Sequence, residues 1–144
     1  MAASIPIILC GRAATVGIPV IKGLLPKYDV IHMALSAEAG ATDIPMILDG
    51  KVLPATDPPN LGSGDYSKSP VAVVMGRGYD EAQIKLMRDA CKDKRGINWL
   101  RADLSVSVPE AGPAYSNHIV GRMKACLDGL AEKGELYGEG MHLF

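Results

Sequence analysis

Residues 5–17 read IPIILCGRAATVG, an almost unbroken apolar run that ends at a glycine and continues into a turn of small residues. A run that is apolar on both faces is typical of a central strand in a parallel sheet, because helices cover both faces of such a sheet. The stretch therefore predicts a first β-strand that leads through a tight turn into a helix, the opening unit of an α/β domain.

Three later segments are also apolar enough to form buried strands. They are residues 28–35, 71–75 and 97–100. The clearest helix begins at Asp80, where Gln83 completes the spacing of a capping box. A second helix is predicted over 116–130, while glycine and proline weaken the helices expected over 15–25 and 37–48. The order predicts a Rossmann-like three-layer α/β sandwich with a parallel sheet of about four strands.

The chain has 144 residues, of which 48% are hydrophobic and 22% charged, values typical of one globular domain spanning residues 1–144. Fifteen basic and sixteen acidic residues give a net charge of -1, which argues against nucleic acid or an acidic membrane as a partner. We therefore expect a small-molecule ligand. No spacing of His, Cys, Asp or Glu matches a metal site. The apolar run at 5–10 is too short for a signal peptide or a membrane span, so we expect a cytoplasmic protein.

Two segments fall outside this pattern of strands and helices. Residues 54–70 are rich in proline and glycine, and their length predicts a lid or a disordered excursion. Residues 133–144 read as a C-terminal tail with three glycines and an apolar end. Such a tail either docks on its own domain or inserts into a second subunit.

The turn from Gly11 to Gly17 is the best candidate for a binding motif. In a parallel sheet, ligands bind outside the carboxyl ends of the strands, and amides at a helix N-terminus favour a phosphate there. The turn resembles the GxxGxxG turn of extended and atypical short-chain dehydrogenases and related NAD(P)-binding Rossmann proteins, with Ala14 in place of the middle glycine. The alternative interpretation is a tight turn whose glycines serve only close packing of the helix.

This resemblance implies a set of residues that contact the cofactor. They are Gly11, Arg12, Ala14, Thr15, Val16 and Gly17 in the turn, Ser36 after the second strand, and Gly76 and Arg77 after the third. No acidic residue ends the second strand to hold the ribose of NAD, whereas Arg12 could pair with a 2'-phosphate. NADP is therefore the expected cofactor. Arg12, Arg77 and Arg101 could line one anion-binding edge, although arginines at strand ends are commonly solvated or paired with acids.

Candidates for chemistry are few. The tyrosine and lysine pair of the resembled dehydrogenases is missing, because Ile119 stands four residues after Tyr115. Tyr115 and His118 could instead handle a proton near the start of the last helix. Cys10, at the end of the first strand, could be a nucleophile, but a buried and inert thiol is the simpler interpretation.

Three hypotheses about function follow. The first is an NADP-dependent, oxidoreductase-like enzyme acting on a small organic substrate with Tyr115 or His118. The second is a non-catalytic module that binds a nucleotide or CoA. The third is an enzyme that uses the strand-end crevice without a cofactor. Four strands supply one mononucleotide-binding half, so a homodimer could complete a dinucleotide site.

Overall fold

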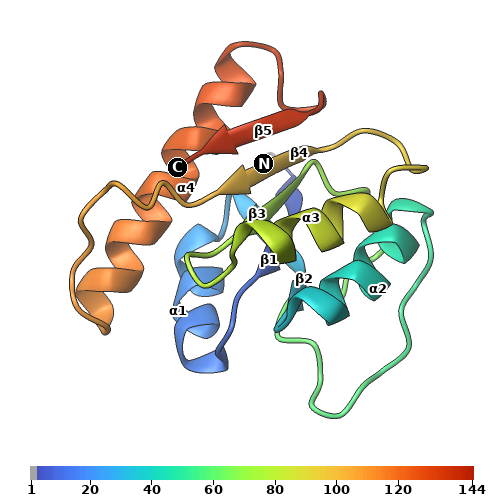
Figure 1. Ribbon diagram of the computed structural model, residues 1–144, viewed down its shortest axis with the longest axis horizontal. Coiled ribbons are helices and arrows are strands. Elements are labelled where there is room, and N and C mark those ends of the chain that lie inside the picture. The colour runs from blue at the N-terminus through green and yellow to red at the C-terminus, as the bar shows by residue number, and fades with distance from the viewer. Residues whose placement is uncertain (1–2) are drawn as a thin grey trace.

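The computed structural model describes residues 3–144, which form a five-stranded parallel sheet between two layers of helices. The elements in chain order are β1 (Ile5–Cys10), α1 (Ala14–Leu24), β2 (Tyr28–Ala34), α2 (Ala37–Leu48), β3 (Ala72–Met75), α3 (Glu81–Ala90), β4 (Asn98–Arg101), α4 (Pro113–Glu132) and β5 (Gly140–Leu143). The strand order is β2-β1-β3-β4-β5 (Figure 1). The predicted α/β sandwich is confirmed, with five strands where about four were expected.

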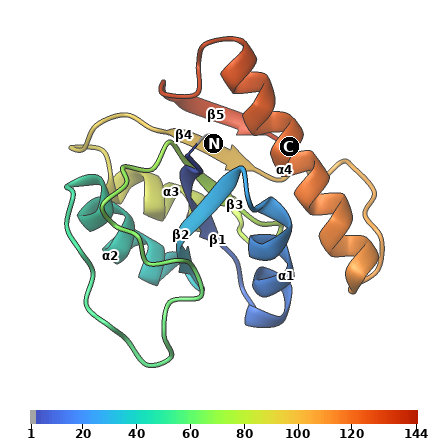
Figure 2. The same ribbon diagram turned by 180° about the vertical axis from the view of Figure 1, so that it is seen from behind.

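The sheet separates two apolar cores, and β1 contributes to both. Ile7 and Leu9 pack on one side with residues of α1 and α4, whereas Ile8 and Cys10 pack on the other with residues of α2 and α3. Figures 1 and 2 show these two helix layers from opposite sides. The alternation explains why the run at 5–10 is apolar at successive positions, since both faces of the strand are buried.

The helix α3 begins where its capping box predicts. The Asp80 carboxylate accepts a hydrogen bond from the Gln83 amide, and the Gln83 side chain accepts one from the Asp80 amide. Together they satisfy two of the amides that every helix leaves free at its start. Among residues 3–144, no helix is both long and apolar enough to cross a membrane.

The last crossover of the sheet differs from the earlier ones. The steps from β3 to β4 and from β4 to β5 go the same way across the sheet, yet α3 and α4 lie on opposite faces. The two connections therefore have opposite hands. Parallel connections are right-handed in about 98% of cases, and β3–α3–β4 has that form (Figure 1), so β4–α4–β5 is the uncommon left-handed form. As a result, no helix of residues 3–144 follows α3 to cover β4 and β5 on that face.

The tail at 133–144 supplies the fifth strand, which the sequence did not predict. Four residues of β5 pair with β4, from Asn98 opposite Gly140 to Arg101 opposite Leu143. The side-chain amide of Asn98 donates to the backbone oxygens of Glu135 and Leu136, which fixes the approach to the strand. The tail thus docks on its own domain, the first of the two arrangements expected for it.

The segment 54–70 has a structural role at the sheet edge. The amides of Ser63 and Gly64 donate to the backbone oxygens of Val30 and Ile31 at 2.8 and 2.9 Å, so this part of the segment lies along the free edge of β2. Unpaired edges invite pairing with other chains, and a loop that covers them prevents it. Residues 60–66 are therefore a cover for β2, which corrects the expectation of a disordered excursion for this half of the segment.

A buried histidine holds the same cover in place. His32, 6% exposed on β2, lies 2.8 Å from the Tyr66 hydroxyl through Nδ1 and 2.9 Å from the Asp43 carboxylate through Nε2. Both ring nitrogens of His32 therefore have a partner. The histidine links the segment to both β2 and α2.

Candidate functional site

The site expected from the sequence lies at the carboxyl edge of the sheet between β1 and β3. β1 and β3 are parallel neighbours, but the chain leaves them toward opposite edges of the sheet. From β1 it continues to β2 on one side, and from β3 it continues to β4 on the other. Ligands of open α/β sheets bind in the crevice at such a point. Two turns meet there, Gly11–Ala13 after β1 and Gly76–Asp80 after β3.

The β1–α1 turn carries a helix start with unsatisfied amides. Ala13 is the N-cap of α1, and within residues 3–144 no side chain caps the helix. The amides of Val16 and Gly17 bond to the Ala13 oxygen, which leaves those of Ala14 and Thr15 without a capping side chain. The first turn of α1 has no acidic residue. This helix end is therefore electrostatically suited to an anion.

The glycines of the turn have a packing role. A Cβ on Gly17 would lie 2.4 Å from both Sδ and Cε of Met33, and a Cβ on Gly11 would lie 2.6 Å from Cε. Met33 is only 5% exposed, so its side chain fills the space beneath the turn. Both glycines are thus explained by the close approach of Met33, which supports the packing interpretation that the sequence had left open.

Arg12 and Tyr79 tie the two turns together. The guanidinium of Arg12 donates to the backbone oxygen of Gly78 at 2.7 Å and lies 5.7 Å from the centre of the Tyr79 ring. The Tyr79 hydroxyl donates to the Gly11 oxygen at 2.8 Å. Burial raises the pKa of Tyr79 well above its usual range, so the hydroxyl stays protonated and remains a donor. Arg12 itself is exposed, and only its Nη1 forms a hydrogen bond within residues 3–144.

The remaining predicted site residues at this edge serve mainly local structure. Arg77 is half-buried and donates to the backbone oxygens of Asp103 and Val106, which holds the loop after β4. Arg101 pairs with Glu81 at 2.7 Å, so the paired interpretation of this arginine is confirmed. The Ser36 hydroxyl accepts a hydrogen bond from the Ala39 amide as the N-cap of α2.

Tyr115 and His118 are not joined to the β1–α1 turn by any hydrogen bond among residues 3–144. Tyr115 packs against the core shared by α1 and α4. His118 lines a separate hollow of about 520 Å³ together with Arg122 and Phe144, and no residue of 11–17 lines it. His118 Nε2 is buried and has no hydrogen-bond partner within the part of the chain that the structure describes.

Cys10 is buried, as the sequence predicted, and its environment makes the thiol unreactive. Its side chain is 0% exposed and its Sγ lies 3.9 Å from Sδ of Met87. Burial, with smaller effects from Cys91 and Asp43, raises the pKa of the Cys10 thiol to about 12. A thiol with such a pKa is neutral at physiological pH and is a poor nucleophile. Within residues 3–144, no group of three His, Cys, Asp or Glu side chains could hold a metal ion.

The thiols are expected to differ in reactivity. Cys10 and Cys91 are buried, whereas Cys126 is half-buried beside the hollow on α4. At pH 8, dithionitrobenzoate should modify Cys126 first, with all three thiols reacting only after unfolding. Cys126→Ser should then lack the early phase in the absorbance of released thionitrobenzoate. Rapid reaction of a second thiol in the folded Cys126→Ser variant would contradict the burial of Cys10 and Cys91.

One comparison with known proteins extends over nearly the whole chain. Kojic acid related protein 6 of Aspergillus oryzae (strain ATCC 42149 / RIB 40) is 32% identical over 145 residues, covering 97% of this chain and 86% of that protein. This chain belongs to the family of that protein. No family model matches the sequence, and no solved structure matches it.

Two residues that shape the site in this member of the family were not singled out from its sequence as site residues. Met33 fills the turn from below, and Tyr79 ties it to the neighbouring loop. Met33 was recognised only as part of an apolar strand. Tyr79 directly precedes the capping Asp80, and the pattern Gly-Arg-Gly-Tyr gives no signal of a hydrogen bond to the first turn.

Proposed function

We propose that the protein binds a phosphate-bearing nucleotide at the β1–α1 turn, with NADP as the first expectation. The observation that carries the proposal is that α1 starts, without a capping side chain, at the point where the strand order reverses. Free amides and the positive end of the helix dipole favour a phosphate at such a place. Arg12 adds an exposed positive charge next to these amides.

The packing of Met33 constrains how a nucleotide would bind. Because Met33 occupies the space under Gly11 and Gly17, a phosphate would approach the outer side of the turn. There the amides of Ala14 and Thr15 and the Thr15 hydroxyl would be its donors. The free N–H groups of Arg12 would contact a second phosphate, such as the 2'-phosphate of NADP.

Binding is better supported than an oxidoreductase reaction. The two residues proposed for proton transfer, Tyr115 and His118, lie on α4, and the hollow that contains His118 is lined by no residue of the turn. The dehydrogenase pair of tyrosine and lysine is also missing from the sequence. We therefore favour a nucleotide-binding protein without hydride transfer at this turn.

A thermal-shift assay with NADPH, NADH, CoA and FMN tests the proposal. NADPH at one hundred times its dissociation constant should stabilise the protein by about 2.7 kcal/mol, because it binds the folded state alone. Arg12→Ala should weaken NADPH binding by about tenfold, the loss of one charge-assisted contact. Lys22→Ala, at the other end of α1, is the matched control and should bind like the original protein.

The assay also has clear negative outcomes. If none of the four compounds raises the melting temperature, or if Arg12→Ala and Lys22→Ala behave alike, the nucleotide proposal is wrong. The printed name of the relative connects that protein with kojic acid, so kojic acid belongs in the same assay. A shift with kojic acid and with no nucleotide would replace the proposal by a site for a small neutral molecule.

A further inference from the structure

A large groove lies between α3 and the strands β4 and β5. It is on the face of the sheet opposite to α4. It has a volume of about 960 Å³, and none of the residues of the β1–α1 turn lines it. An inference about this groove is therefore independent of the proposed nucleotide site. Figure 1 shows α3 in front of the sheet, with β4 and β5 extending beyond it.

The groove follows from the left-handed connection of β4 to β5. A right-handed connection would have placed α4 next to α3, over β4 and β5, whereas α4 lies on the other face with α1. The sheet thus lacks one helix on the α3 side. The empty strip runs beside α3, a helix of ten residues and hence about 15 Å long. The groove is thus a slot beside α3, on the face where a right-handed connection would have placed a helix.

The floor of the groove is apolar. It includes Ile97 just before β4, Trp99 of β4 and Met141 of β5, with Ile84 and Cys91 on the α3 side. Met141 is only partly buried, although it belongs to a strand that packs on the α2 and α3 core. Ile84, Cys91, Ile97 and Trp99 are only 3–8% exposed, so Met141 is the apolar side chain of the floor that a partner would chiefly cover.

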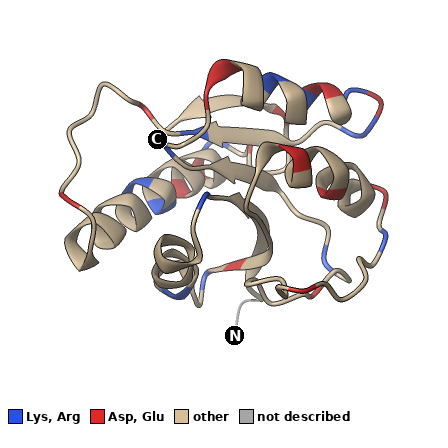
Figure 3. Cartoon of the chain, turned by 60° about the horizontal axis from the view of Figure 1, so that its bottom comes forward, with Lys and Arg blue, Asp and Glu red and all other residues tan. Residues whose placement is uncertain are grey.

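The rim of the groove carries an excess of positive charge. Its lining includes six basic side chains, Lys85, Arg88, Lys92, Lys94, Arg95 and Arg101, but three acidic ones, Glu81, Asp89 and Glu139. This excess contrasts with the net charge of -1 for the chain. Figure 3 shows basic and acidic positions alternating along α3 and the loop that follows it.

Several of these charges are already neutralised within the domain. Lys85 pairs with Asp89 at 2.6 Å, Arg101 with Glu81 at 2.7 Å, and Lys94 with Asp49 at 2.7 Å. Arg88 and Lys92 form no ion pair with any residue of 3–144. These two exposed cations flank the slot from the α3 side.

We propose that this groove is the docking site for an amphipathic helix of a partner protein, with an apolar stripe and acidic flanks. The stripe would cover Met141 and the small exposed part of Trp99, as helices bound in grooves do through anchors at i, i+3, i+4 and i+7. Acidic side chains on the flank would face Arg88 and Lys92, which complements the charge of the rim. A second copy of this chain is a poorer occupant, since a symmetric contact would bring two positively charged rims together.

The single tryptophan of the chain makes the test direct, because Trp99 lies in the groove. The probe is a designed helical peptide of about 18 residues without tryptophan, with leucine at i, i+3, i+4 and i+7 and glutamate on the flanks. The matched peptide has lysine in place of each glutamate. The acidic peptide should shift the Trp99 emission and bind at least about tenfold more tightly than the lysine peptide.

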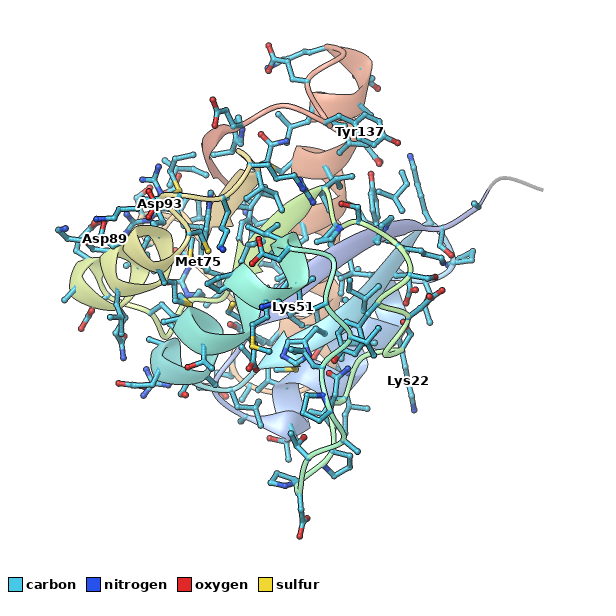
Figure 4. All side chains as sticks on the ribbon, turned by 90° about the vertical axis from the view of Figure 1, so that its right-hand side faces the viewer. Lys22, Lys51, Met75, Asp89, Asp93 and Tyr137 are labelled. Atoms are coloured by element: carbon cyan, nitrogen blue, oxygen red, sulfur yellow. The ribbon has the colours of Figure 1, made fainter. Side chains whose placement is uncertain are left out.

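Charge reversal on the protein gives the second arm of the test. The double variant Arg88→Glu, Lys92→Glu should weaken the acidic peptide by about tenfold. The control double variant Lys22→Glu, Lys51→Glu changes the net charge equally at positions that do not line the groove, and should bind normally. Figure 4 shows Lys22 on the opposite side of the view from Asp89 and Asp93. Circular dichroism and urea unfolding of both variants check that the fold is retained.

Four outcomes would overturn the proposal. They are equal binding of the two peptides, equal effects of the two double variants, binding that leaves the Trp99 emission unchanged, and a concentration-dependent dimer that shifts the emission without peptide. Laurate provides a further comparison because it is apolar and anionic without being helical. If laurate displaces the peptide and its own binding depends on Arg88 and Lys92 in the same way, the groove is a site for small amphiphilic anions instead.

Discussion

Replacing Gly62 by alanine is expected to lower the free energy of unfolding by about 3 kcal/mol, a large effect for one methyl group. A Cβ at this position would lie 2.4 Å from the Val30 oxygen, 2.8 Å from the His32 amide nitrogen and 2.8 Å from the Ile31 carbonyl carbon. All three are backbone atoms of β2, so no side chain can move aside to relieve the overlap. The cover of β2 would have to lift from the strand.

Urea unfolding measures the loss of stability, thermal unfolding the fall in melting temperature, and hydrogen exchange the lifting of the cover. The melting temperature should fall by roughly 10 °C. The Met33 amide, which donates to the Asn60 side chain, should lose protection because the same segment carries Asn60.

Gly121→Ala is the control, since its Cβ would meet nothing within 4 Å inside α4. That variant should gain about 0.5–1 kcal/mol through helix propensity. A Gly62→Ala protein as stable as the original would mean that the cover does not pack against β2 as described.

The sequence predicted those elements whose signal is local or fully apolar. The strand at 5–10 was recognised with its observed bounds, and α3 begins directly after its capping Asp80. The last helix was predicted over 116–130, and it extends to Pro113–Glu132 because a proline suits the first turn of a helix. In each case the residues that determine the element lie within the element itself.

The elements that were missed depend on distant partners. β5 has four residues and begins at a glycine, so its side chains carry little strand preference, and its register comes from backbone pairing with β4. The cover at 60–66 likewise depends on backbone groups of β2. The left-handed crossover cannot be read from the order of elements, because that order is the same for either hand.

The turn proposed as a site lies at the carboxyl edge of β1 as expected, but the packing role of its glycines was not accessible from the sequence. A glycine that lets a phosphate approach and a glycine that makes room for a neighbouring side chain leave the same pattern. The difference lies in Met33, sixteen residues after Gly17, whose side chain happens to end beneath the turn. Only the packing of β2 against α1 reveals it.

Met33→Ala is expected to lower the free energy of unfolding by about 3 kcal/mol. The Met33 side chain is only 5% exposed, so its removal leaves a cavity beneath the turn. The same variant tests whether Gly17 is needed to make room for the Met33 side chain. In the original protein, Gly17→Ala forces Met33 out of its rotamer, since the new Cβ would lie 2.4 Å from its Sδ and Cε. Because these atoms end a flexible side chain, the cost should be about 1–2 kcal/mol.

In the Met33→Ala background, Gly17→Ala should instead stabilise the protein by about 1 kcal/mol, because the added methyl enters the cavity and alanine favours the helix. The double-mutant cycle should therefore give a coupling free energy of about 2–3 kcal/mol, measured by urea unfolding of the four proteins. Additive effects within about 0.5 kcal/mol would contradict the packing role of Gly17.

NADPH binding by the same four proteins separates a glycine needed for packing from a glycine needed for phosphate approach. If the glycine is needed for close approach of a phosphate, Gly17→Ala weakens binding equally in both backgrounds, whereas a packing glycine lets affinity survive once Met33 no longer presses on the turn.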